Sequence, residues 1–80
     1  MIDPGNQRPV RVGLEPETGP YIMLTVKALE QVRQILKANG VSFWVDPHMT
    51  SVDDGPTYAW IYIHKKTDPS YVQSLIDTGA

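Results

Sequence analysis

Apolar and polar residues alternate along several short stretches of the chain, and this period of two predicts strands. The alternation marks residues 10–14, 21–25, 41–46 and 57–64, and it is clearest in the last of these. Asp53-Asp54-Gly55-Pro56 has the composition of a turn, so residues 49–52 are expected to pair with residues 57–60 as a hairpin.

Two other stretches repeat with a helical period. The first predicted helix begins after Thr25, whose hydroxyl is expected to cap it, and ends at Asn39-Gly40, where Gly40 can adopt the left-handed conformation. Its apolar stripe consists of Val26, Leu29, Val32, Ile35 and Leu36. The second helix is expected to begin at Asp68-Pro69, with aspartate as N-cap and proline in the first turn, and to end before Gly79. Its apolar positions are Tyr71, Val72, Leu75 and Ile76.

The resulting order, strand-strand-helix-strand-strand-helix, predicts one α+β domain over residues 10–80 after a flexible lead-in, residues 1–9. Over residues 10–78 this order resembles the ferredoxin-like plait, β-α-β-β-α-β, in architecture. The resemblance implies an antiparallel or mixed sheet with two helices on one face and with residues 21–25 and 57–64 in the centre. Residues 41–46 would then form an edge, which suits Pro47 because proline cannot donate to a neighbouring strand. Residues 10–14 would occupy the edge that the plait's missing last strand leaves vacant.

The alternation also predicts which side chains face the helices. The aliphatic set belongs to the helix-covered side: Ile22, Leu24, Val41, Phe43, Val45, Ala59, Ile61 and Ile63. The opposite, outer side then receives Tyr21, Met23, Trp44, Tyr58, Trp60, Tyr62 and His64. Continuous pairing from the turn at residues 53–56 would place Val45 on the outer side, so a one-residue bulge near Pro47 is expected to return it to the core.

Composition narrows the classes of function. The chain has 80 residues, a formal net charge of −2 and no cysteine, which excludes disulfides and thiolate metal sites. It shows neither the basic stripe typical of nucleic-acid binding nor an apolar run long enough to span a membrane. No signal peptide is recognisable at the N-terminus, and we expect a soluble cytoplasmic protein.

The outer aromatic side is the principal functional candidate, because single domains seldom expose a large apolar patch. Four interpretations compete. The first is that a second copy of the chain or the N-terminal segment covers it, and the second is that another protein docks there. A small molecule enclosed between two such faces is the third, and stacking of single-stranded bases is the fourth and least favoured.

Candidate catalytic or metal chemistry is sparse. Three carboxylates and one imidazole lie in a short stretch, at Asp46, His48, Asp53 and Asp54, and are candidate ligands of a divalent metal. The sequence around them is also ordinary turn chemistry, which needs no metal. His64 ends the aromatic strand and, with Tyr62, could line a cavity as a general base, as in dimeric enzymes of the plait architecture. No nucleotide-binding or nucleophile motif is present, so we expect a non-enzymatic module without a cofactor that self-associates or binds a protein.

Overall fold

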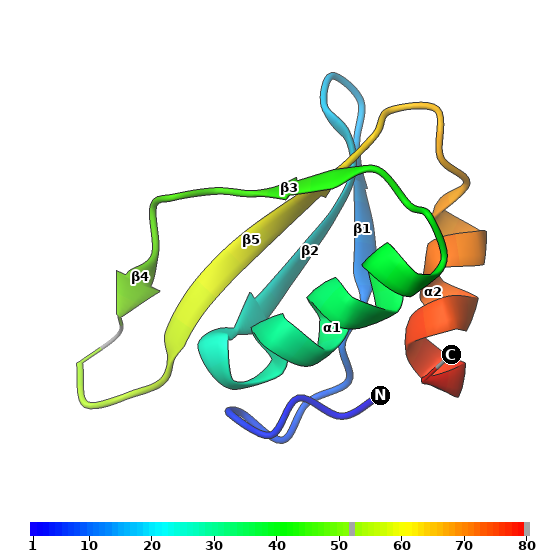
Figure 1. Cartoon of the computed structure of the whole chain (residues 1–80). Helices are drawn as coiled ribbons and strands as arrows, with labels where there is room; N and C mark the ends of the chain where they lie inside the picture. Colours follow the sequence, from blue (N-terminus) through cyan, green and yellow to red (C-terminus); the bar gives the residue numbers. More distant parts are fainter. Residues whose placement is uncertain (52, 80) are drawn as a thin grey trace.

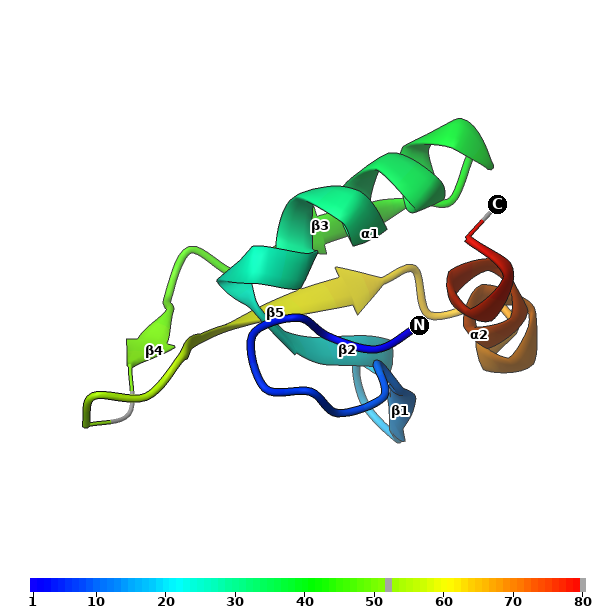
Figure 2. The same ribbon diagram turned by 90° about the horizontal axis from the view of Figure 1, so that it is seen from below.

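The computed structural model describes residues 1–51 and 53–79 and shows a small α+β protein with a five-stranded antiparallel sheet and two helices. Both helices lie on one side of the sheet (Figure 1, Figure 2). Along the chain the elements are β1 (Val12–Glu15), β2 (Gly19–Thr25), α1 (Val26–Ala38), β3 (Phe43–Val45), β4 (Thr50–Ser51), β5 (Thr57–Ile63) and α2 (Pro69–Thr78). Neither of these helices is long and apolar enough to cross a membrane.

The central strands of the sheet are β2 and β5. The strand order is β1-β2-β5-β3, and the short β4 also pairs with β5, beyond β3. The register places Tyr21 opposite Tyr62 and Met23 opposite Trp60. Since β2 and β3 are joined through α1 and β5 lies between them, the sheet is held together mainly by contacts between residues far apart in sequence.

The aliphatic side chains of the sheet pack against the helices. Ile22, Ile61 and Ile63 are fully buried, and each buried aliphatic side chain of this size contributes about 1.5–3 kcal/mol. From the helices, the buried residues are Ala28, Val32, Ile35, Leu36, Val72, Leu75 and Ile76. The predicted stripe of α1 was wrong at its first residue. Val26 is 40% exposed, because it opens the helix beyond the sheet, and the small Ala28 is buried instead.

Local sequence signals fix three of the four helix ends. At the end of α1, Gly40 has φ +68°, Val41 N–H donates to the Leu36 carbonyl and Gly40 N–H to the Lys37 carbonyl, as in a Schellman motif. Asp68 caps α2 by accepting from Ser70 N–H at 2.9 Å, and Gly79 ends it in the left-handed conformation. Thr25 is the N-cap residue of α1, but the prediction that its hydroxyl caps the helix was wrong, because its side chain donates to Asp3 instead.

Opposite β5 the edge is interrupted between β3 and β4. Val45 pairs with Ile61 and Thr50 with Tyr58, so the four residues 46–49 stand opposite the two residues 59–60. The insertion is therefore two residues, and the predicted one-residue bulge was wrong. The hairpin pairs Ser51 with Thr57. Without any insertion, this register would already place Val45 on the helix side of the sheet. Inserting two residues keeps it there, because side chains alternate with a period of two. Val52, part of the predicted hairpin, lies outside the described residues.

The N-terminal segment, for which the sequence predicts a flexible lead-in, contacts the body of the protein at several points. The carboxylate of Asp3, 2% exposed, accepts from Gly5 N–H at 2.8 Å, from Thr25 N–H at 2.7 Å and from the Thr25 hydroxyl. Ile2 forms an isolated bridge with Pro9, and the Met1 ammonium lies 3.3 Å from a carboxylate oxygen of Asp77 in α2. Val10 then enters the core at 2% exposure. The first ten residues thus contact both the end of β2 and α2.

Candidate functional site

Aromatic side chains form two parallel rows on the side of the sheet that lacks helices. One row runs across four strands, through Gly13, Tyr21, Tyr62 and Trp44. In the next row Met23 faces Trp60, whose carbonyl accepts from Asp46 N–H at 2.9 Å. We call the following set the outer face: Tyr21, Met23, Trp44, Tyr58, Trp60 and Tyr62. Met23 and Trp44 are 50% and 55% exposed, while the other four are partly buried.

Trp44 stands beside Tyr62 at the β3 end of this face. Their ring centroids are 5.4 Å apart and the planes are inclined by 31°, a packing distance typical of aromatic pairs. The Tyr62 hydroxyl donates to Asp46 Oδ2 at 3.4 Å, and Asp46 Oδ1 also accepts from His48 N–H at 2.8 Å. These contacts orient Tyr62 and leave Trp44 as the most prominent ring on the outer face.

The pKa values of the same group reflect its hydrogen bonds. The pKa of Asp46 is lowered, first by the backbone N–H of His48, with desolvation as an opposing effect. The pKa of Tyr62 is raised, first because its hydroxyl is partly removed from water and then because the Asp46 carboxylate is near. Tyr62 is therefore a neutral hydrogen-bond donor around pH 7.

At the β1 end the outer face is hollowed. A methyl group placed on Gly13 would overlap the ring of Tyr21, so the ring lies across the β1 backbone where only glycine leaves room. Beside it is an open groove of about 830 Å³ between the hairpin turn and the central strands. The described residues that line it are Pro9, Arg11, Val12, Gly13, Glu15, Pro16, Glu17, Thr18, Tyr21, Met23, Trp60 and Tyr62. The face is thus raised at Trp44, and toward β1 it opens into the groove beside the Tyr21 ring.

The N-terminal segment covers one end of the outer face. Asn6 Nδ2 donates to the Tyr58 hydroxyl at 3.3 Å, and Gly5 sits against the side chain of Thr25. Met23 and Trp44 nevertheless keep about half of their surface exposed. The N-terminal segment therefore contacts Tyr58 but does not cover the whole outer face.

His64 lies apart from the groove. The residue is exposed, its Nδ1 accepts from Lys66 N–H at 3.2 Å, and it is not among the described residues that line the groove. The sequence suggests that His64 and Tyr62 line one cavity together, but of the two only Tyr62 lines the groove.

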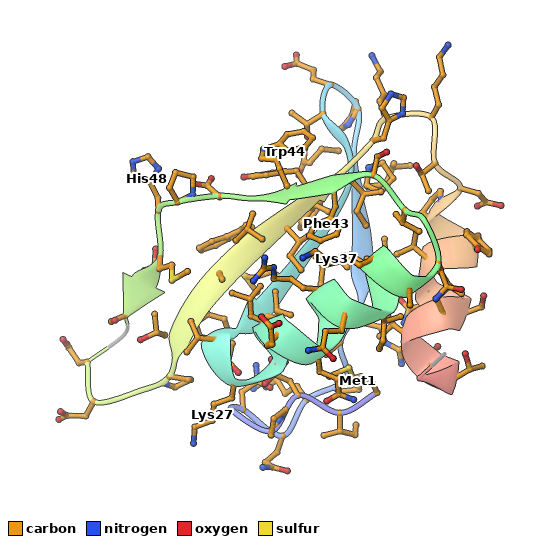
Figure 3. All side chains as sticks on the ribbon, in the orientation of Figure 1. Met1, Lys27, Lys37, Phe43, Trp44 and His48 are labelled. Atoms are coloured by element: carbon orange, nitrogen blue, oxygen red, sulfur yellow. The ribbon has the colours of Figure 1, made fainter. Side chains whose placement is uncertain are left out.

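The four metal candidates do not converge. Asp46 and His48 contact each other, with His48 Nδ1 3.1 Å from Asp46 Oδ1, and Figure 3 shows His48 pointing away from the molecule. Asp53 and Asp54 are exposed in the turn before β5, where Asp54 has φ +51°. Among residues 1–51 and 53–79, no group of three or more histidine, aspartate or glutamate side chains is arranged to hold a metal ion.

Sequence reasoning missed that Gly13 and Asp46 border the outer face. The signal for Gly13 was the alternation along β1, in which Arg11, Gly13 and Glu15 share one side of the strand and Gly13 has no side chain. The sequence suggests Asp46 only as a metal ligand.

Comparison of the chain with models of protein families, with curated proteins and with solved structures gives no match.

Proposed function

We propose that this protein is a non-enzymatic, plait-like module that self-associates through its outer face. The observation that carries the proposal is the shape of that face, which is raised at Trp44 on one edge and opens into the groove beside Tyr21 toward the other. A surface with a projection and a matching hollow can pair with a copy of itself about a two-fold axis, since such an interface uses the same patch twice.

A two-fold axis that lies parallel to the strands would stack β1 of one copy over β3 of the other. Gly13 and Trp44 lie in the same row across the sheet, so the indole of each copy would enter the groove of its partner. Packed sheets keep their strands within about 30° of each other, which preserves this correspondence of rows.

Charge supports the same arrangement. Arg11 borders the groove one residue before Val12, which pairs with Ile22, so Arg11 is at the level of Met23 and Trp60. Asp46 occupies the opposite edge at that level. Stacking β1 over β3 would therefore place Arg11 of each copy near Asp46 of its partner. Charges of opposite sign at the rim favour this register over its alternatives.

The composition of the face is typical of an interface. A standard interface would bury about 800 Å² per partner, roughly a sixth of the 5047 Å² that the chain exposes. Tyrosine, tryptophan and methionine are the residues enriched in the cores of such interfaces. A small domain without disulfides gains stability from association as well.

Sedimentation equilibrium tests the proposal directly. The wild-type chain of 9.0 kDa should sediment with twice that mass, and Trp44→Ala should sediment as a monomer. Tyr71→Ala is the matched control, because Tyr71 is an aromatic residue of similar exposure, 46%, located on α2 away from the outer face. A monomeric wild type at millimolar concentration, or a Trp44→Ala variant that remains dimeric, would show the proposal to be wrong.

A charge exchange tests the register of the two copies. Arg11→Asp and Asp46→Arg should each weaken association, and the two changes together should restore part of it, because the exchanged charges again face each other. Exposed pairs contribute about 0.2–1 kcal/mol each, and the symmetric dimer contains the pair twice. If the double variant is weaker than both single variants, the stacking of β1 over β3 is incorrect even where the dimer itself exists.

A ligand site in the same groove is the second candidate. Its volume of about 830 Å³ falls within the range of small-molecule sites, about 300–1,000 Å³. The two functions differ in one measurement, because a ligand that occupies the groove would compete with Trp44 and dissociate the dimer.

A further inference from the structure

The free edge of β3 presents backbone groups that have no partner strand. Within the part of the chain that the structure describes, β3 pairs only with β5. The Ser42 carbonyl accepts from His64 N–H, and Asp46 N–H donates to the Trp60 carbonyl, so residues 42 and 46 point toward β5. Because hydrogen-bonding direction alternates along an antiparallel strand, the N–H and C=O groups of Phe43 and Val45 point outward.

Beside this edge a groove of about 690 Å³ separates β3 from α1. Its apolar lining is formed by Leu29, Val41, Phe43, Trp44, Val45 and Met49, and its charged lining by Arg33 and Lys37. Leu29, Arg33 and Lys37 are spaced by four residues and therefore follow one line along the helix. Figure 3 places Lys37 beside Phe43, between α1 and β3, and Lys27 near the opposite end of the helix.

The groove carries basic charge alone. No aspartate or glutamate is found among the described residues that line it. Arg33 is held by Glu30 at 3.0 Å through Nη1, while its Nε is buried without an acceptor. An acidic side chain entering the groove would neutralise Lys37 and, after a small rotation of the guanidinium group, supply that acceptor.

We propose that the edge of β3 accepts an extended, acidic segment of another protein as an additional strand. The main chain of the segment would pair with Phe43 and Val45, and its inward side chains would alternate between apolar groups on Phe43 and carboxylates on Arg33 and Lys37. This is strand addition, in which the backbone supplies affinity and the flanking groove supplies specificity. A second copy of this chain is a poor occupant, since pairing two β3 edges would bring two basic α1 surfaces together. The groove lies between β3 and α1, and of the described residues that line it only Trp44 also belongs to the outer face.

A fluorescent peptide of about seven residues, close to the usual length of a strand, provides the test. Every second residue of the peptide is threonine, and the positions between the threonines are valine and glutamate in turn. A second peptide carries lysine in place of each glutamate. Fluorescence anisotropy should give a dissociation constant on the order of 100 µM for the acidic peptide, a typical weak interaction, and none measurable for the lysine peptide. Equal binding of the two peptides, or none by either, would overturn the proposal.

Two variants of α1 separate the groove from general charge. Lys37→Glu should weaken the acidic peptide about tenfold, since reversing one near charge changes attraction to repulsion by about 1–1.4 kcal/mol in total. Lys27→Glu makes the same change at the other end of the helix and should alter the affinity less than about twofold. Equal effects of the two variants would contradict a site at the groove.

The role of the backbone is tested on the peptide, so that folding of the protein is unaffected. Methylating alternate amide nitrogens along one edge of the peptide removes the donors of that edge and leaves the other edge intact. One of the two methylated peptides should lose binding and the other should retain it. If both bind as the parent does, the segment is not added as a strand and the proposal fails.

Discussion

Replacing Asp3 by alanine tests whether the N-terminal segment is part of the fold. Its buried carboxylate accepts three hydrogen bonds, from Gly5 N–H, Thr25 N–H and the Thr25 hydroxyl. Bonds to a charged group contribute about 1.5–3 kcal/mol each, but part of that gain is offset by the cost of burying the charge. Truncation leaves the buried donors of Thr25 without an acceptor, and we expect a loss of about 3 kcal/mol in the free energy of unfolding.

That loss is large for a chain of this length. Total stabilities of about 0.05–0.15 kcal/mol per residue imply about 4–12 kcal/mol for 80 residues. With a urea dependence of about 1 kcal/mol per molar, typical of a small domain, the unfolding midpoint should fall by about 3 M. Asp3→Asn preserves the shape but turns an amide toward one of the donors, so its midpoint should lie between those of the wild type and Asp3→Ala.

Urea unfolding followed by tryptophan fluorescence measures the three midpoints. Asp53→Ala is the control, because Asp53 is exposed in a turn and its truncation should cost no more than about 0.5 kcal/mol. Amide exchange at Thr25 should also be faster in Asp3→Ala than in the wild type. A midpoint within about 0.5 M of the wild type would refute the reasoning and favour the flexible lead-in that the sequence predicts.

Two further predictions concern Tyr62 and Gly40. The pKa of Tyr62 is raised, so the stability that this shift confers is complete below pH about 10 and is lost as pH rises through the higher pKa of the folded state. The difference between the absorbance titrations of the wild type and Tyr62→Phe should show this late ionisation, and Asp46→Asn should shift it to lower pH. A titration that Asp46→Asn leaves unchanged would contradict the contact between the two residues. Gly40→Ala should lower the free energy of unfolding by about 1–2 kcal/mol, because φ is +68° there. A methyl group would meet no atom within 4 Å, so the loss comes from the backbone conformation alone. The melting temperature should fall by several degrees, and an unchanged value would contradict the left-handed end of α1.

The parts of the fold that could be predicted are those that short-range patterns determine. Residues 57–64 alternate strictly, so the sides of Trp60 and Ile61 follow from the sequence, and Gly40 and Asp68 mark helix ends by their own conformational preferences.

The parts that could not be predicted depend on contacts between distant residues. Asp3 reads as one polar residue in a stretch rich in proline and glycine, and its partner Thr25 is 22 residues away. The insertion after Val45 depends on the register of the hairpin, which the sequence of the turn leaves open by one residue. Likewise, the close approach of the Tyr21 ring to Gly13 depends on the register of β1 and β2, which pairs these two residues.

The position of β5 between β2 and β3 has a consequence for how the chain acquires its structure. During synthesis, β1, β2, α1 and β3 emerge first, yet β2 and β3 do not pair with each other, and both wait for a strand that ends at Ile63. Until then the nascent chain has one hairpin and an amphipathic helix with few partners, and two strands have unpaired edges. Because non-local pairing of this kind slows folding and exposes apolar surface, a chain released early should aggregate, and productive collapse should coincide with the arrival of β5.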